Sequence, residues 1–373
     1  MGQLADESGY HITFLDTDHR LVELLKSRGS YAVQLVSAKP RTVTVSNYSV
    51  LHPDEGEALF SAFQRASVIL TAVCPENVPA AADELRPHFV RWLKMSGDRS
   101  TKNVFCCENM NRSTSAFRDH LCKGLPADLL PSLEKRVGFP DTMIARVVAR
   151  PRDPLSLLGE EYSEWTADRA AVRGTPPPSV KTLDLVEGQE RYLQRKLYIH
   201  NTGHATFGFL GFLKGHTYVH EAALDPAIME ICEKAIEESG WAVEHEHGFS
   251  FDVILHYRKA LTEKCVLPQL PDELLRVVRD PVRKLGAQER FFGPIGLMLK
   301  HGRQPHFLLY GVAAALLCAI PGDAASISLR QAMAAGGVAG ALKLCGAAVP
   351  ASVVSSIESL LPAVRSRFGA QGT

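Results

Sequence analysis

The sequence predicts a two-domain chain, in which an α/β domain built on a parallel sheet precedes a mostly α-helical domain. Three observations lead to this prediction. Short apolar runs alternate with helical spacing in the first half, long helical segments fill the second half, and a proline cluster lies between them. At 373 residues, the chain is also too long to fold around a single hydrophobic core, so two domains are expected.

Four short apolar runs mark the expected strands of the first half. Each run ends at a polar or turn-forming residue, and segments with helical spacing flank the runs. Continuous apolar runs of this length are typical of strands in a parallel sheet that helices cover on both faces. The four runs are residues 11–15, 68–73, 104–107 and 142–148.

A boundary between the domains is expected at residues 174–179, GTPPPS, because three consecutive prolines exclude both helix and central strand. We therefore assign residues 1–178 to the first domain and residues 179–373 to the second. Beyond the boundary the spacing of apolar residues predicts helices at residues 190–213, 225–239, 252–264, 272–285, 307–319 and 329–344.

The first domain is expected to be Rossmann-like, but its beginning is unusual. In a dinucleotide-binding unit, a G-x-G-x-x-G turn lies about 20 residues before the acidic residue that ends the second strand. Only 15 residues precede Asp16, and they contain no such turn. We expect the first strand and its phosphate loop to be missing, through a start codon placed too far downstream or a truncated gene. The alternative is a fold that never had this strand.

Composition excludes several classes of protein. Lys and Arg together number 41, as do Asp and Glu, so the balance of charge favours neither a nucleic acid nor an anionic membrane as partner. The longest apolar run, residues 307–320, is shorter than the roughly 18 residues that a membrane span needs. The eight cysteines are scattered, with no C-x-x-C pair. We expect a reduced, cytoplasmic protein that is a monomer or a small homo-oligomer.

Residues that directly follow the predicted strands are the candidates for cofactor binding, because ligands of parallel sheets collect beyond the carboxyl ends of the strands. These positions hold Asp16, Cys74, Pro75, Glu108 and Asn109. An acidic residue such as Asp16 is the usual partner of an adenosine ribose and disfavours the 2′-phosphate of NADP. An aspartate can also end a strand for turn chemistry alone.

A second candidate site lies in residues 195–215, RKLYIHNTGHATFGFLGFLKG, where polar residues interrupt an apolar, glycine-rich segment. In an α-helix His204 would lie roughly 80°, and Asn201 roughly 140°, around the axis from Lys196, so that one face holds all three. A lysine on an apolar wall is a candidate base of lowered pKa. The alternatives are a surface lysine, and an Asn201 that only caps a helix. We expect His200 to be structural.

Six segments, taken together and in order, resemble the polyol-specific long-chain dehydrogenases. The most specific element is K-x4-N-x2-H within the longer NTGHA stretch. A chain of this length is similar to the branch of the family that acts on phosphorylated polyols. The segments are TFLDTD at 13–18, LTAVCP at 70–75, CENMNRST at 107–114, SEWTADR at 163–169, KLYIHNTGHATFGFLGFLKG at 196–215 and RKLGAQERFFGP at 283–294.

The resemblance implies an NAD-binding Rossmann domain, a helical substrate domain and a hydride transfer that requires no metal. By the family pattern, Lys196 matches the general base. Asn109 and Asn201 match the pair that hydrogen-bonds the reacting oxygen, and His204 matches a contact to a substrate hydroxyl. The family usually has an aspartate where Ala145 stands.

Four basic residues are the candidates for holding the substrate. Arg276 and Lys284 match family positions that bind the polyol chain. Arg279 and Arg283 are our candidates for the phosphate, because guanidinium groups match the geometry of phosphate oxygens. A pair of arginines four residues apart can also line an exposed helix face.

Other histidines carry less weight. His216 and His220, with Glu221 adjacent, have the spacing of a metal-binding pair, but no third ligand at a recognisable spacing accompanies them. We therefore expect no metal site. His245 and His247 are expected in a solvated loop.

The leading functional hypothesis is the NAD-dependent oxidation of mannitol 1-phosphate to fructose 6-phosphate, as the resemblance implies. One alternative keeps the fold and changes the substrate to unphosphorylated mannitol or a hexuronate. The other is an inactive remnant or binding protein.

Overall fold

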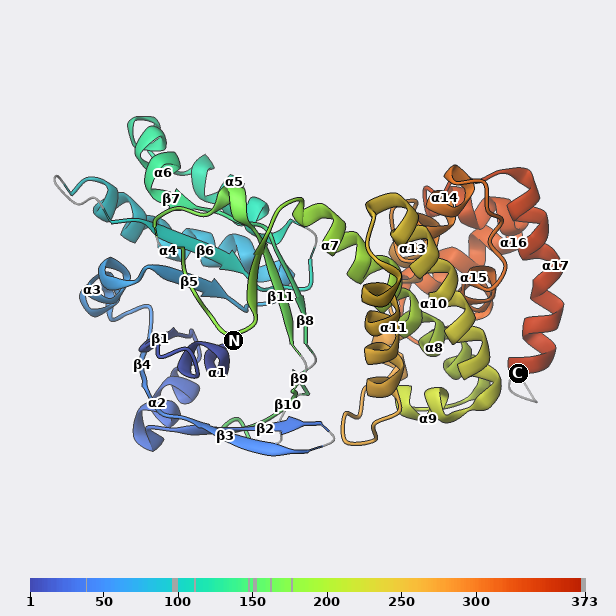
Figure 1. Ribbon diagram of the computed structural model, residues 1–373, viewed down its shortest axis with the longest axis horizontal. Helices are drawn as coiled ribbons and strands as arrows, with labels where there is room; N and C mark the ends of the chain where they lie inside the picture. Colours follow the sequence, from blue (N-terminus) through green and yellow to red (C-terminus); the bar gives the residue numbers. More distant parts are fainter. Residues whose placement is uncertain are drawn as a thin grey trace. The chain divides into compact units, whose positions relative to one another are not determined.

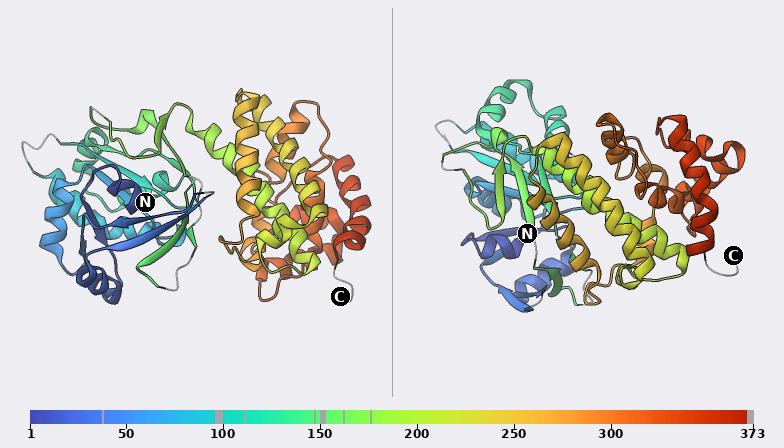
Figure 2. Two further views of the ribbon diagram at one scale, coloured as in Figure 1. Left: turned by 60° about the horizontal axis from the view of Figure 1, so that its bottom comes forward. Right: turned by 45° about the vertical axis from the view of Figure 1, so that its right-hand side comes forward.

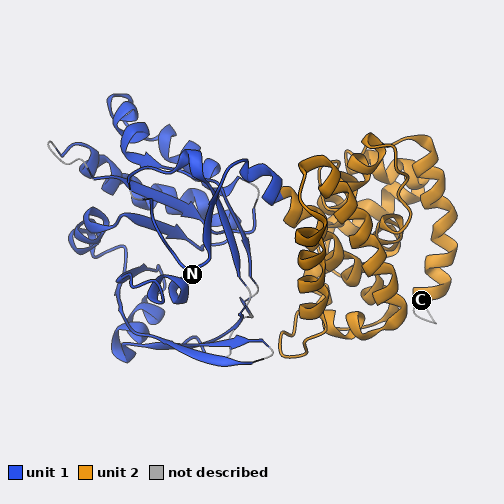
Figure 3. Cartoon of the chain, in the orientation of Figure 1, with its two compact units in different colours: residues 1–193 blue, residues 194–373 orange. Residues whose placement is uncertain are grey.

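The computed structural model describes residues 1–37, 39–95, 100–110, 112–146, 148–149, 153–161, 163–175 and 177–369. They form two compact units, Met1–Leu193 and Gln194–Thr373 (Figures 1 and 3). The predicted boundary at residues 174–179 precedes this division and includes residue 176, which lies outside the described residues. The exact boundary therefore stays a prediction.

Unit 1 contains the parallel strands that three of the four apolar runs predicted. In one sheet Ile12 lies opposite Tyr48, and in the other Val68 lies opposite Asn103. The runs at 11–15, 68–73 and 104–107 are thus confirmed as strands. The first sheet pairs β1 (Ile12–Leu15) with β4 (Tyr48–Leu51), and the second has the order β5 (Val68–Thr71), β6 (Lys102–Cys106), β7 (Val137–Gly138).

Helices lie between these strands in the sequence, as the alternation predicted. Their apolar faces bury a core that includes Phe89, Trp92 and Phe117, each without exposed surface. The helices are α1 (Gly2–Asp6), α2 (His19–Arg28), α3 (Gly56–Arg65), α4 (Val78–Leu93), α5 (Ser113–Lys123) and α6 (Leu130–Arg136), with short 3₁₀ turns at Pro75–Asn77, Ala127–Leu129 and Arg169–Ala171.

The fourth apolar run does not join a parallel sheet. β8 (Thr142–Ala145) is antiparallel to β11 (Glu164–Asp168), which is parallel to β12 (Leu183–Val186). The parallel pairing expected for residues 142–148 is therefore wrong, and residue 147 lies outside the described residues. An apolar run indicates a buried strand, and Met143 and Ala145 are indeed buried. It does not indicate whether the partner strand runs parallel or antiparallel.

A further sheet of unit 1 was not predicted. Its strand order is β3 (Arg41–Val45), β2 (Tyr31–Val36), β10 (Ser156–Glu160), β9 (Val148–Ala149). The pairing of β10 with β2 joins segments more than a hundred residues apart, with Ser156 opposite Ala32.

Unit 2 is helical, as expected (Figure 2). It encloses its own apolar core. The predicted helix 272–285 is divided in two at Asp280. This residue has a φ of 55°, which is not helical, and the second helix begins at the next residue, Pro281. The helices are α8 (Asn201–Lys214), α9 (Val219–Leu224), α10 (Pro226–His247), α11 (Phe251–Cys265), α12 (Leu274–Val278), α13 (Pro281–Lys284), α14 (Phe292–Lys300), α15 (Leu308–Leu317), α16 (Ala324–Leu344) and α17 (Ala351–Phe368).

Two features of unit 2 bear on expectations from the sequence. His245 and His247 belong to the last turn of α10, so their assignment to a loop is wrong; the helix continues until Gly248, whose φ is 69°. The apolar run at 307–320 forms the buried helix α15. Within the described part of the chain, no helix has both the length and the apolar character needed to cross a membrane.

Candidate functional site

The segment that carries Lys196, Asn201 and His204 is not one continuous α-helix. α7 (Gln189–Arg195) leads into a π-helical turn, Lys196–His200, and α8 follows from Asn201. The Asn201 N–H donates to the carbonyl of Lys196, five residues earlier. This wide turn brings residues five apart toward one side, so the α-helical angle expected between Lys196 and Asn201 does not apply. Such turns are rare and occur frequently at functional sites.

Lys196, Asn201 and His204 are all half-buried in unit 2. Between them His200 accepts a hydrogen bond from Nζ of Lys264 on α11, at 2.7 Å. Burial lowers the pKa of His200 well below its usual value, and the positive charges of Lys264, His204 and Lys196 lower it further. The ring of His200 is therefore neutral, and its lone pair serves Lys264.

Asp272, which sequence reasoning missed, holds His204 in place. Oδ2 of Asp272 lies 2.8 Å from Nε2 of His204, and both of its oxygens accept from Arg276, at 2.6–2.8 Å. Burial by itself raises the pKa of Asp272, but hydrogen bonds from His204 and Arg276 outweigh it and bring this pKa to about 2. The carboxylate is thus ionised and links the two candidate residues.

Burial lowers the pKa of His204, although the bond to Asp272 acts in the opposite direction. A neutral ring that donates from Nε2 to Asp272 has an unprotonated Nδ1, which can accept a hydrogen bond. His204 therefore suits a contact with a hydroxyl group. The rings of His204 and His200 lie 6.2 Å apart, so the two histidines belong to one polar cluster.

The other basic candidates lie at and after the end of α12. Arg279 is exposed, whereas Arg283 is paired with Asp280 at 2.8 Å and with Glu289 at 3.4 Å. Lys284 is only 5% exposed. Burial, together with the charges of Arg290 and Arg283, lowers the pKa of Lys284 to about 7.

In unit 1, Cys74 adopts a backbone conformation that suits glycine. Its φ of 69° and ψ of 150° place it in a region that side chains with a Cβ rarely occupy. A glycine would adopt this conformation without strain. Cys74 and Pro75 are both exposed, just after β5, and Cys74 is one of eight free cysteines.

Asp16 and Asn109 follow β1 and β6. Oδ1 of Asp16 accepts from the backbone N–H of Asp18 at 2.9 Å, so the turn chemistry considered for this residue is present. Asn109 is exposed. Both residues remain predictions as contacts of cofactor and substrate.

The side chain of Glu108 is directed toward the end of β5 and the loop that follows it. Its carboxylate accepts from the Thr71 hydroxyl at 2.9 Å and from the Val73 N–H at 3.0 Å, and the residue is 9% exposed. The geometry supports a role in holding the Cys74 loop. Direct binding of a cofactor by Glu108 stays a prediction.

The residues present fit two parts of a dinucleotide. Asp16 suits the adenosine ribose, and the Cys74 loop and Asn109 lie at the carboxyl ends of the parallel strands β5 and β6, where ligands of such sheets bind. The 373 residues hold no G-x-G-x-x-G turn for the pyrophosphate.

The geometry gives no support to a metal site at His216 and His220. The Glu221 carboxylate accepts from the N–H groups of Thr217 and Tyr218, and His216 lies 3.5 Å from Asp225. Ala145, where the family usually has an aspartate, is buried on β8.

Sequence reasoning missed Asp272, Lys264 and Glu289. A D-x3-R pattern at Asp272 and Arg276 is the one local signal, because residues four apart can pair when the chain turns as a helix. The contacts of Asp272 with His204 and of Lys264 with His200 span 68 and 64 residues, and no spacing rule predicts them.

Two family models together match most of this chain. The model of the mannitol dehydrogenase Rossmann domain matches residues 1–179, and that of the mannitol dehydrogenase C-terminal domain matches residues 189–335. Mannitol-1-phosphate 5-dehydrogenase of Geobacillus stearothermophilus is 31% identical over 92% of this chain and 90% of its own. The enzyme of the same name from Thermoanaerobacter pseudethanolicus is 31% identical over 85% and 82%, respectively.

Solved structures share the fold. A D-sorbitol dehydrogenase in substrate-free form has a TM-score of 0.80 at 14% identity, covering 98% of this chain and 89% of its own. Pseudomonas fluorescens mannitol 2-dehydrogenase, in a ternary complex with NAD and D-mannitol, has a TM-score of 0.70 at 15% identity, covering 95% and 85%. The Rossmann-like and helical domains predicted from the sequence are thus confirmed. The chain belongs to the mannitol dehydrogenase family, and the prediction of a polyol dehydrogenase is confirmed with it.

Proposed function

We propose that this enzyme oxidises mannitol 1-phosphate to fructose 6-phosphate, in a reversible reaction. The cofactor is NAD, as the sequence predicted. The observation that favours a phosphorylated substrate is the buried Lys284, on whose pKa the cations Arg290 and Arg283 act more strongly than the carboxylates of Asp280 and Glu289. An anionic group beside Lys284 would offset the cost of burying its charge. The names of the two curated relatives point to the same substrate.

Asp16 and the Cys74 loop would hold NAD, which would supply the acceptor for the hydride of the carbinol carbon. Lys196 takes the proton of the reacting hydroxyl, and Asn201 donates a hydrogen bond to the oxygen as negative charge develops on it. Nδ1 of His204 accepts a hydrogen bond from a second hydroxyl group of the substrate. Asn109, in unit 1, retains the role that the family resemblance implies, as a further donor to the reacting oxygen.

The decisive experiment compares phosphorylated and free substrates on the same protein. We expect NADH formation from mannitol 1-phosphate to exceed that from mannitol or a hexuronate by at least about 100-fold in kcat/KM, since charge-assisted contacts give selectivity of that size. Calorimetric titration of mannitol 1-phosphate in the absence of NAD measures substrate binding separately from hydride transfer. Equal turnover of free mannitol would contradict the proposal. Substrate binding without turnover would favour the remnant or binding protein.

Single variants test the phosphate contacts. Arg279→Ala and Arg283→Ala should weaken binding of mannitol 1-phosphate but not of mannitol. Because Arg283 is already paired with Asp280 and Glu289, we expect the larger loss from Arg279→Ala. Arg330→Ala, an exposed arginine on α16, is the matched control and should change neither affinity.

A further inference from the structure

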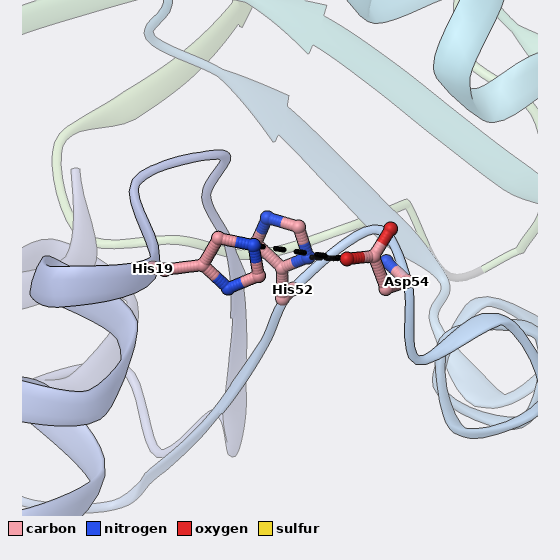
Figure 4. A group of neighbouring side chains, drawn as sticks. All are labelled: His19, His52 and Asp54. Carbon is pink, nitrogen blue, oxygen red and sulfur yellow. Dashed lines mark hydrogen bonds and ion pairs between the residues drawn. The ribbon is translucent and has the colours of Figure 1, made fainter.

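Two histidines and an aspartate gather in unit 1, outside every residue assigned above (Figure 4). Of the residues that the structure describes, His19, His52 and Asp54 form one group whose possible ligand atoms all lie within 4.8 Å of one another. His19 begins α2, and the other two follow β4. Neither the family resemblance nor the proposed reaction uses them.

Two of the distances in this group are close to the distance between neighbouring ligands of a tetrahedral metal ion. Oδ2 of Asp54 lies 3.1 Å from Nδ1 of His52 and 3.7 Å from Nε2 of His19. Two ligands bound at about 2.1 Å to one tetrahedral zinc lie about 3.4 Å apart, which is between these two values. Imidazole nitrogens with one carboxylate are a ligand set for zinc and similar ions rather than for magnesium or calcium.

His52 has the tautomer that a metal ligand at Nδ1 requires. Its side chain is only 12% exposed, and Nε2 lies 3.3 Å from the carbonyl of Thr17. A carbonyl can only accept, so Nε2 carries the proton and Nδ1 presents its lone pair to the group. Without an ion, this lone pair accepts the N–H of Asp54 at 3.2 Å, which agrees with this tautomer, and a bound ion would replace that hydrogen bond. A backbone carbonyl behind a ligating histidine is a common feature of metal sites.

The side chains of the other two ligands, His19 and Asp54, are largely exposed, which leaves them space to change rotamer. The rings of His19 and His52 are stacked, with centroids 3.6 Å apart, so their lone pairs run side by side and do not converge. His19 is 69% exposed at its side chain and has room to turn its ring toward the ion. The carboxylate of Asp18 caps the start of α2 and offsets the positive end of this helix.

We propose that His19, His52 and Asp54 bind a divalent transition-metal ion such as Zn²⁺, with water completing the coordination. The ion connects the segment after β1 to the segment after β4, which are neighbouring strands with Leu15 opposite Leu51. It therefore braces the turn that also holds Asp16. The proposal does not depend on the reaction or on its substrate.

Titration of the EDTA-treated full chain with Zn²⁺, followed by competition with a chromophoric chelator, tests the site. We expect one equivalent to bind and the thermal midpoint of unfolding to rise, because an ion that binds only the folded state stabilises it. Since even indirect partners of metal ligands contribute about 10- to 100-fold in affinity, His52→Ala should weaken binding by at least about 100-fold. No binding, or unchanged binding in this variant, overturns the proposal.

Three further variants and one spectroscopic measurement show whether a change in zinc binding comes from this site. His19→Gln and Asp54→Asn change exposed side chains, so their folds should be intact while zinc binding falls. His120→Ala removes a histidine that pairs with a single aspartate, Asp83, at 3.0 Å, and should leave binding unchanged. Co²⁺ should give a visible spectrum without a thiolate charge-transfer band. Such a band would place the metal on the cysteines instead and would also overturn the proposal.

Discussion

At the scale of single residues, Asp272 is the side chain that connects two candidate site residues. It is ionised and bonded to both His204 and Arg276. We expect Asp272→Asn to lower kcat by about 10- to 100-fold, because a misplaced contact group costs rate in that range. Steady-state kinetics over a range of pH checks this, since a freed His204 should also alter the pH profile.

The matched control for that variant is Asp225→Asn. Asp225 likewise pairs with a lysine and a histidine, Lys214 and His216, and caps α10. Asparagine remains a good helix cap, so the fold should be kept. A loss of activity as large as that of Asp272→Asn would contradict the positioning role.

The lowered pKa of Lys284 should make the stability of the folded protein depend on pH. Its pKa is about 7 in the folded chain against an ordinary value of 10.5. Between these two values the unfolded chain binds more protons than the folded one, so the free energy of unfolding must rise with pH. We expect the urea midpoint to be higher at pH 9 than at pH 7 by an amount that Lys284→Met reduces. An identical rise in the variant would contradict the lowered pKa.

At the scale of elements, the π-helical turn at Lys196–His200 sets the relation of Lys196 to the residues of α8. A deletion of Leu197 should restore an ordinary helix and rotate Lys196 by about 100° relative to Asn201. We expect kcat to fall at least about 100-fold while helical circular dichroism is kept. Leu197→Ala, which keeps the register, is the control. Full activity of the deletion variant would show that the turn has no such role.

Apolar runs and helical spacing were enough to predict three parallel strands and most helices of unit 2. They could not predict the π-helical turn, because its sequence has the apolar spacing of an ordinary helix. They also missed the antiparallel direction of β8, which depends on β11, and the contact of Asp272 with His204, which the fold brings together over 68 residues. Properties that depend on a distant partner are the ones that local patterns omit.

At the scale of the whole molecule, each unit has apolar clusters drawn only from its own residues. We expect the isolated fragment 194–373 to fold by itself and to unfold cooperatively in urea. The fragment 179–373 should be less soluble, because it carries β12 without its partner β11. Comparing the two fragments by circular dichroism and sedimentation tests the boundary. A longer fragment that is the more stable of the two would favour residue 178.

The loop after β5 has a practical consequence. Of the eight free cysteines only Cys74 is exposed, while the rest are buried or half-buried. A maleimide fluorophore should therefore attach to the natural chain at this one place, beside the strand ends where NAD is expected. A change in the emission of this fluorophore would then report the binding of NAD over time, in a protein that carries no mutation.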